Sequence, residues 1–259
     1  KINDNYFNNV QQVFSIDIGD PVKLHSGGGQ IYFIDNQIEN SSQVSVLFEA
    51  NPDMEADLSD TIFVFQGNQI SSGSHYSTII FKGDDNNPAK GRLLFKNNNL
   101  ERVGLRVQRI EEALIQENTI DHYSSSGAAQ AVTIDDVDKV LIEKNTLSSD
   151  FKVLSINGGG DGIDEDTIRY NTISEATFSQ SLGATGTYGI LIDGDASPII
   201  YNNNMVNNDT QIKNETSNTI DARFNWWGET VTAEMDAGGN PKNISSIYDM
   251  FDDSQYGEV

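Results

Sequence analysis

One short pattern recurs along almost the whole chain and restricts what the chain can fold into. Its clearest copy is EALIQENTI, Glu112 to Ile120, in which an asparagine stands three residues after one large apolar residue and two residues before another. Copies follow one another at intervals of 20 to 32 residues. A repeat of that length is typical of solenoids, propellers and other arrays, whose units stack to bury a continuous core. The recurring asparagines are Asn5, Asn36, Asn68, Asn98, Asn118, Asn145, Asn171, Asn203 and Asn225.

Short segments rich in Ile, Val and Phe, punctuated by Asn and Gly, indicate strands rather than helices. A second apolar segment, which we term the upstream strand, precedes the asparagine strand in each repeat. In compact repeats its spacing is fixed, since Leu105 and Val132 are each thirteen residues before their asparagine. Two constant registers predict a coil with several strands per turn. The expected upstream strands are PVKLHS from Pro21, SVLFEA from Ser45, TIIFK from Thr78, GLRVQ from Gly104, AVTID from Ala131, VLSIN from Val153, GILID from Gly189 and QIKNE from Gln211.

The asparagine itself is expected at a sharp corner. Alternation places the residues three and five before it on one face, and the chain must then turn for the residue two after it to point inward as well. Such a corner commonly needs a left-handed backbone, which Asn tolerates better than other non-glycine residues. Stacked coils also let neighbouring amides bond to one another. The residues expected in this ladder are Asn36, Asn68, Asn98, Asn118, Asn145, Asn171 and Asn203.

These repeats resemble those of the right-handed parallel β-helix, the pectin-lyase-like superfold. The resemblance implies an all-β solenoid of about nine coils, in which three short parallel sheets wrap a stacked apolar core. It covers residues 1–228, and residues 229–259 are expected to form a capping tail. The superfold hosts lyases, hydrolases, epimerases and adhesins, so it implies little about function.

The segment IDARFNWWG, Ile220 to Gly228, resembles the last-coil motif of bacterial extracellular β-helix repeat proteins. A solenoid needs a cap, because its last coil otherwise exposes apolar core and strand edges. We therefore expect Asn225, Trp226 and Trp227 to close the end of the solenoid rather than to stack on a sugar. Related tails run on into another strand, so the resemblance implies that this segment belongs to a longer chain.

Charge and composition exclude several classes of partner. Lys and Arg number 16 and Asp and Glu 39, giving a formal charge of −23, which repels nucleic acid and anionic lipid. No cysteine is present for disulfides or thiolate metal sites. No apolar run approaches the ~20 residues of a membrane span. With the resemblance, these features predict a bacterial extracellular or cell-surface protein with no membrane insertion.

The outward positions of the upstream strands form a column that is basic early and acidic late. We expect this column to bind a polysaccharide or cell-surface glycan. In the lyases that the repeats resemble, acidic residues on this face bind calcium, and a Lys or Arg removes the proton beside a uronate carboxylate. The candidate bases are Lys82, Arg106 and Arg109, for which exposed charges without a role are the alternative. The candidate ligand-binding residues are His25, Arg106, Asp135, Asn157 and Asp193.

The loop GGGDGIDED is the richest acidic segment beside glycine. Hard oxygen ligands in such a loop suit Ca²⁺, so calcium is a possible cofactor here. The candidate metal ligands are Asp161, Asp164 and Asp166 from the loop and Asp193 from the next coil; the alternative is a solvated acidic loop. The three histidines, His25, His75 and His122, show no metal-ligand spacing.

Three functions remain open from the sequence. The regular repeat, the terminal NWWG and the lack of a complete catalytic motif favour a glycan-binding or adhesion module without its own catalytic centre. The basic-to-acidic column favours a calcium-dependent lyase acting on uronate-containing glycans. A passive spacer within a surface protein is the third reading.

Overall fold

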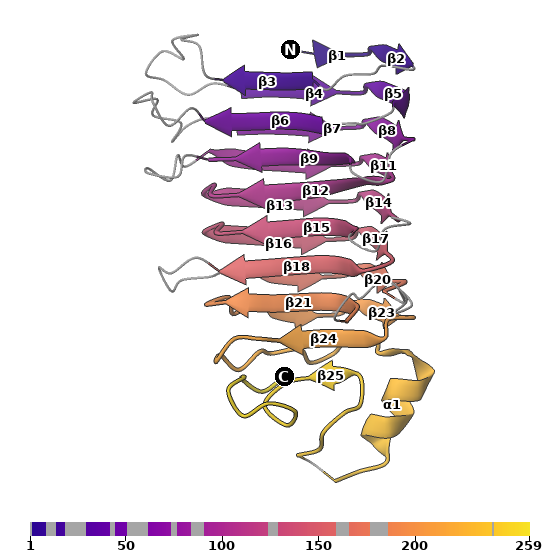
Figure 1. The fold of residues 1–259 in the computed structure, drawn as a ribbon, viewed down its shortest axis with the longest axis vertical. Helices are drawn as coiled ribbons and strands as arrows, with labels where there is room; N and C mark the ends of the chain where they lie inside the picture. The colour runs from indigo at the N-terminus through magenta and orange to yellow at the C-terminus, as the bar shows by residue number, and fades with distance from the viewer. Residues whose placement is uncertain are drawn as a thin grey trace.

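The protein is a single stack of coils, with the N-terminus in the first coil and a non-repetitive tail beyond the last one (Figure 1). The expected right-handed parallel β-helix is confirmed. The structure is a computed structural model, which describes residues 2–8, 14–18, 30–41, 45–50, 62–73, 77–83, 91–123, 129–158, 166–176, 186–239 and 241–259.

Three parallel sheets form the walls of the stack. Sheet A has eight strands, which hold the residues before each asparagine corner. Each strand pairs in register with the strand one coil away, as Phe65 does with Phe95 and Phe95 with Ile115. In order, the strands are β1 (Ile2–Asn3), β4 (Gln30–Ile34), β7 (Ile62–Gln66), β10 (Arg92–Lys96), β13 (Glu112–Gln116), β16 (Lys139–Glu143), β19 (Thr167–Arg169) and β22 (Ile199–Tyr201).

Sheet B also has eight strands and begins directly after the corner. Its inward residue is the apolar residue two positions after each asparagine, such as Ile120, which is fully buried. The strands are β2 (Tyr6–Asn8), β5 (Gln37–Ser41), β8 (Gln69–Ser72), β11 (Asn99–Glu101), β14 (Thr119–His122), β17 (Thr146–Ser149), β20 (Thr172–Ser174) and β23 (Asn204–Val206).

Sheet C has nine strands and contains the upstream strands. The expected strands from Ser45 onward are confirmed. PVKLHS lies outside the described residues, and the first described strand of sheet C is an earlier segment, β3. The strands are β3 (Phe14–Ile18), β6 (Ser45–Ala50), β9 (Ser77–Lys82), β12 (Val103–Gln108), β15 (Gln130–Asp135), β18 (Lys152–Gly158), β21 (Tyr188–Gly194), β24 (Thr210–Asn214) and β25 (Ile247–Tyr248).

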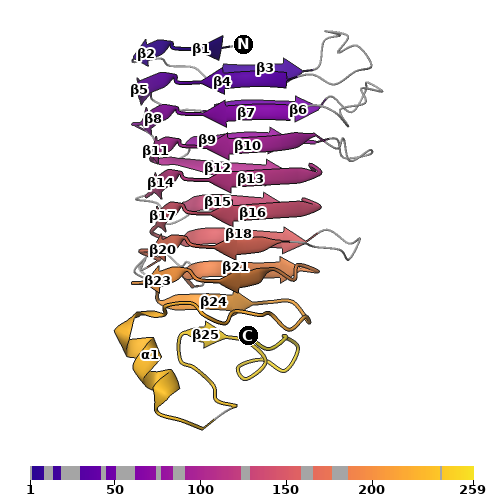
Figure 2. The ribbon, with the colours of Figure 1, turned by 180° about the vertical axis from the view of Figure 1, so that it is seen from behind.

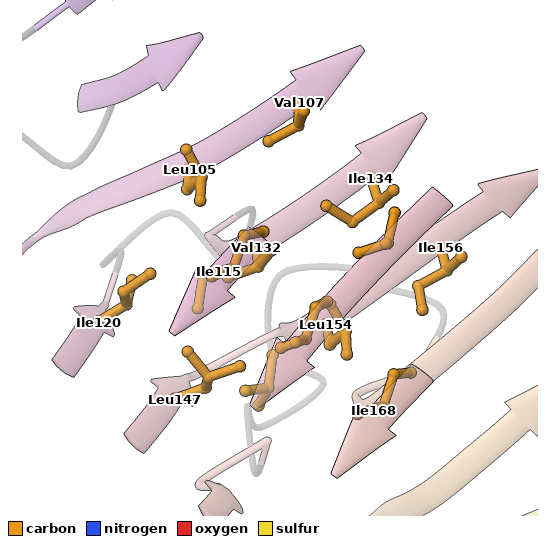
Figure 3. Packing of buried hydrophobic residues seen from close by; sticks show 14 of the residues in the cluster. Leu105, Val107, Ile115, Ile120, Val132, Ile134, Leu147, Leu154, Ile156 and Ile168 are labelled. Atoms are coloured by element: carbon orange, nitrogen blue, oxygen red, sulfur yellow. The ribbon is translucent and has the colours of Figure 1, made fainter. Parts of the chain in front are cut away.

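The core is a set of apolar columns that run through the stack. Phe33, Phe65 and Phe95 stack on one another, with ring centroids 4.8 and 5.0 Å apart, and Phe81 meets Phe65 edge to face at 6.0 Å. In later coils the columns change to Ile, Leu and Val (Figure 3). Full burial of one such side chain contributes about 1.5–3 kcal/mol. These apolar columns therefore stabilise the coils that the structure describes.

The asparagine ladder is present, and it extends from Asn5 to Asn225. The Nδ2 of each asparagine donates to the Oδ1 of the next, and the backbone N–H donates to the same oxygen, all at 2.9–3.2 Å. The interior members are 0–2% exposed. Stacking thus satisfies polar groups that burial would otherwise leave without partners.

The prediction that the asparagine itself adopts the left-handed backbone conformation was wrong. The residue with positive φ is the one before each asparagine, for example Glu117 at 57° and Lys144 at 57°. The ladder explains the difference, because Asn must point its amide along the stack. The preceding residue points to solvent and takes up the left-handed turn. The corner residues are Asp4, Asp35, Gly67, Asn97, Glu117, Lys144, Tyr170, Asn202 and Phe224.

The structure of the C-terminal end differs from the predicted cap in the role of Trp226. Asn225 closes the ladder and Trp227 is 8% exposed, but Trp226 is 48% exposed and does not plug the solenoid. Its backbone instead bridges to Asn204 as a continuation of sheet B. A helix that the sequence pattern did not predict, α1 (Gly228–Asp236), follows the last coil, and β25 then extends sheet C. Both views show the helix and tail below the last coil (Figures 1 and 2).

Candidate functional site

The outward face of sheet C carries two aligned columns of polar side chains. Strand pairing sets Arg106 beside Thr133 and Thr133 beside Ser155 in the first column. The second column continues from coil to coil in the same register. We call this surface the sheet C platform; it consists of Arg106, Thr133 and Ser155 and of Gln108, Asp135, Asn157 and Asp193.

Asp135 is the centre of the platform's hydrogen bonding. Its Oδ2 accepts from Arg106 Nη2 at 3.0 Å and from Gln108 Nε2 at 2.7 Å, and its Oδ1 accepts from Asn157 Nδ2 at 3.0 Å. Partial burial of the carboxyl acts to raise its pKa, but these hydrogen bonds and the Arg106 charge outweigh burial and lower the pKa of Asp135. The network crosses three coils and holds its members in fixed positions.

An aromatic and cationic cluster lies at the C-terminal end of the same face. Lys213 Nζ lies 5.2 Å from the ring centroid of Tyr188 and 5.0 Å from that of Tyr248, and it forms an ion pair with Glu215. Tyr248 in turn packs against Tyr256, with centroids 6.0 Å apart. Cation–π contacts of this kind fix both the lysine and the rings.

Lys152 lies beside this cluster, because β18 pairs it with Tyr188 of β21. Within the described part of the chain it makes no ion pair. Burial lowers the pKa of the Lys152 ammonium, and the Lys213 charge acts in the same direction, whereas the charges of Glu215 and Asp193 oppose the change. The site therefore combines a partly desolvated cation with aromatic rings.

The candidate bases lie together at the early end of the platform. Lys82 pairs in register with Gln108, so it lies one coil from Arg106 and Arg109. Arg106 is already bound to Asp135, and Arg109 Nε is 3.8 Å from Asp136 Oδ2. His25, which is a candidate ligand-binding residue rather than a base, lies outside the described residues. The structure thus gives Arg106 a positioning role toward Asp135, and the catalytic role of all three candidates stays a prediction.

The candidate calcium ligands are only partly described. Asp161 and Asp164 lie outside the described residues. Asp166 is 3% exposed, and its Oδ1 accepts from the backbone N–H of Val140 at 2.8 Å, so it supports the preceding coil. Asp193 lies on the platform, where its Oδ1 accepts from the N–H of Gly194 at 2.7 Å. No three His, Asp or Glu side chains converge on a common point in the segments that the structure describes.

Nitrogen and sulfur donors are few and dispersed. His122 is 5% exposed, and its Nδ1 is bound to the carbonyl of Gln130 at 2.8 Å. Met205 is fully buried in the core, Met235 packs against the core, and Met250 is 44% exposed in the tail. His25 and His75 are not among the described residues. The described donors therefore form no site for a soft metal, which needs several such ligands together.

Sequence reasoning missed Lys152, Tyr188 and Tyr248. Gln130, Lys152 and Tyr188 share a register, but they lie three residues before Thr133, Ser155 and Leu191, so simple alternation from the outward column reaches the buried Ala131, Val153 and Gly189 instead and does not find them. Tyr248 had no signal in the repeat either. Its strand β25 comes from the non-repetitive tail, and only the fold brings it beside Lys213.

A cavity of about 690 Å³ lies between the last coil and the tail. Apolar side chains dominate its wall, among them Ile220, Trp227, Met235, Ile247 and Phe251. The tail thus covers the open core without filling the space beneath it.

The chain matches the family model described as "Periplasmic copper-binding protein (NosD)" over residues 24–243. Comparisons with curated proteins and with solved structures give no match. No helix in the described residues has the length and hydropathy of a membrane span.

Proposed function

This chain belongs to the NosD family of β-helix proteins, and on that premise we propose that it is an extracytoplasmic module that binds glycans along the sheet C platform without catalysing their cleavage. The family description names a periplasmic protein, which agrees with the extracellular or cell-surface location expected from the sequence. The family description does not mention glycans. Glycan binding is inferred from the platform.

The observation that carries the proposal is the continuity of the platform. Hydroxyl, amide, carboxylate and guanidinium groups repeat from coil to coil at the strand spacing of about 4.8 Å. The Asp135 network holds three of these side chains in place before any ligand arrives, which lowers the entropic cost of binding. A long polymer with hydroxyl groups suits such a repeating surface.

The Tyr188, Lys213 and Tyr248 cluster supplies the apolar element that sugar recognition also uses. Tyrosine rings present a broad apolar surface with a polar tip, and Tyr248 is 37% exposed. The cluster and the platform share sheet C and follow one another along the stack. In the first column the buried Leu191 lies between Ser155 and Lys213, so the platform and the cluster are two neighbouring contact points for an extended glycan.

The same geometry disfavours the hypothesis that the protein is a polysaccharide lyase. A proton-abstracting base must have a free lone pair, whereas the guanidinium group is a hydrogen-bond donor without an acceptor, and that of Arg106 donates to Asp135. The pairing of Arg109 with Asp136 has the same consequence. Lys82 remains the candidate base for this alternative.

Copper binding is the second candidate, and the family description alone favours it. The described residues do not fit a copper site, because His122 is buried with Nδ1 bound to a carbonyl and the described methionines lie apart. We therefore derive no step through copper for this chain.

A glycan array followed by calorimetry tests the proposal. We expect specific binding, weakened at least tenfold by Arg106→Ala and by Tyr248→Ala, because each removes a different part of the surface. Thr146→Ala on sheet B is the matched control and leaves the affinity unchanged. No binding on the array, together with release of unsaturated products from uronate polymers, would instead establish the lyase.

A further inference from the structure

The outward face of sheet A carries an apolar stripe that runs across seven consecutive strands. Strand register places one outward residue of each strand in a single line. Figure 2 labels the central strands β7, β10, β13 and β16 one beneath another. All members are at least partly exposed, and Ile199 is 50% exposed. They are Tyr32, Val64, Leu94, Leu114, Leu141, Thr167 and Ile199.

Such a face differs from the usual setting of parallel sheets, which are covered on both sides. An apolar patch that follows the whole length of a sheet marks an interaction surface. Six of the seven members are apolar or aromatic, with Thr167 the exception. The stripe contributes nothing to the core, because the inward residues of the same strands already fill it.

The charge beside the stripe also differs from that of the rest of the chain. Its flanks and the corner residues before each asparagine in its seven coils hold five basic and four acidic residues, a sum of +1. The whole chain carries −23, so the remainder carries −24. Two copies of so acidic a chain repel each other at long range. Contact through this face does not bring two strongly acidic surfaces together. The flanking residues are Arg92, Lys96, Lys139, Lys144 and Arg169, with Asp35, Glu112, Glu117 and Glu143.

We propose that a second copy of this chain docks on the outward face of sheet A, in a two-fold pair whose axis runs parallel to the strands between β13 and β16. Since Glu112 and Lys139 share a register, this axis sets Glu112 opposite the partner's Lys139. It also sets Leu114 opposite the partner's Leu141. A two-fold interface repeats each contact twice.

The same axis matches the rest of the stripe. Gln116 faces the partner's Glu143, and Val64 faces the partner's Ile199 across two further coils. Within the paired strands that the structure describes, this axis brings like charges together at Lys96 and the partner's Arg169. Each of these cations already has an acidic neighbour within its own chain, Glu117 at 3.5 Å for Lys96 and Glu143 at 2.7 Å for Arg169.

The size of the face sets the strength of the pair. Seven strands about 4.8 Å apart span about 29 Å, and a five-residue strand about 16 Å, which gives roughly 900 Å² for both copies. Stable interfaces bury about 1,200–2,000 Å². An interface of this size belongs to the weak and transient class, so the pair is expected to be a reversible dimer. The proposal is independent of glycan binding, which uses sheet C.

Sedimentation velocity over a micromolar concentration series tests the dimer. The wild type is expected to shift from monomer to dimer as concentration rises. Leu114→Glu is expected to raise the dissociation constant at least tenfold, because it places an unpaired carboxylate beside the axis. Thr146→Glu adds the same charge to an exposed position of sheet B in the neighbouring coil and leaves the constant unchanged. Circular dichroism verifies that both variants fold.

Charge exchange tests the docking geometry. Glu112→Lys and Lys139→Glu are each expected to weaken the dimer, since each opposes like charges across the axis. The variant that carries both substitutions restores it, because opposite charges then face each other across the axis again. A monomer at every concentration, a dimer indifferent to Leu114→Glu, or a double exchange that fails to restore affinity overturns the proposal.

Discussion

The side-chain Nδ2 of Asn98 lies 3.0 Å from Oδ1 of Asn118, and the backbone N–H of Asn98 donates to the same oxygen at 2.9 Å. Asn118 also donates from its own Nδ2 to the carbonyl of Phe95 at 2.9 Å. One buried side chain therefore satisfies groups in more than one coil. Neighbouring coils are thus coupled through the buried hydrogen bonds of the ladder as well as through the apolar core.

Asn118→Ala is expected to lower the free energy of unfolding by about 3–5 kcal/mol, because several buried polar groups lose their partner at about 1–3 kcal/mol each. Chemical denaturation measures the change. Asn99→Ala, at an exposed position in the same region, is the control and costs at most about 0.5 kcal/mol. Equal losses for the two variants would contradict the role of the ladder.

Lys144→Gly is expected to stabilise the fold by about 0.5–1 kcal/mol, because Lys144 has φ 57° and glycine adopts that conformation without strain. Lys144→Val is expected to destabilise it by about 1–2 kcal/mol, since a β-branched residue resists positive φ. Thermal unfolding of both variants provides the comparison. A destabilising glycine would show that the turn is not where the strain lies.

Trp227→Ala is expected to cost about 3 kcal/mol or more, because its ring is 8% exposed and packs at the end of the core. Trp226→Ala is expected to cost less than about 1 kcal/mol, because that side chain is 48% exposed. Denaturant unfolding of the pair distinguishes the adjacent tryptophans. The reverse order would restore the expectation that Trp226 seals the end.

Asp135 should make stability fall at acidic pH. Its folded pKa is lowered below the ordinary 3.8, so its contribution is present above that value and is lost as pH falls through the folded pKa. The difference in stability between wild type and Asp135→Asn should therefore shrink below about pH 4. Asn157→Ala removes one donor and is expected to raise the Asp135 pKa, which an NMR titration follows. An unchanged pKa in that variant would contradict the network.

Copper titration tests whether His122 acts as a copper ligand in this chain. We expect wild type and His122→Gln to give the same Cu(II) and Cu(I) isotherms, because the His122 ring is buried and its Nδ1 is bound to the carbonyl of Gln130. Isothermal titration calorimetry measures copper binding by both proteins, and circular dichroism verifies that both retain the fold. Loss of stoichiometric copper binding in His122→Gln would show that this ring is a ligand.

Part of the candidate site could be predicted from the same repeat that predicted the fold. Because side chains alternate along each upstream strand, the residues Arg106, Asp135, Asn157 and Asp193 were expected on the outward face. Their hydrogen bonds did not follow from spacing, since rotamers and neighbouring coils decide which group Asp135 accepts from. Tyr248 lay beyond the repeat altogether.

The sequence by itself determined the local periodicity: strand, corner, strand, with apolar residues inward and asparagine at each turn. These features depend on residues within one repeat, where alternation and turn chemistry act over a few positions. Tertiary structure alone decided that the residue before Asn118 takes the left-handed turn, because only stacking commits the Asn118 amide to its neighbours. It also decided that Trp226 faces outward and that Tyr248 meets Lys213, since both outcomes depend on how a non-repetitive tail folds against the last coil.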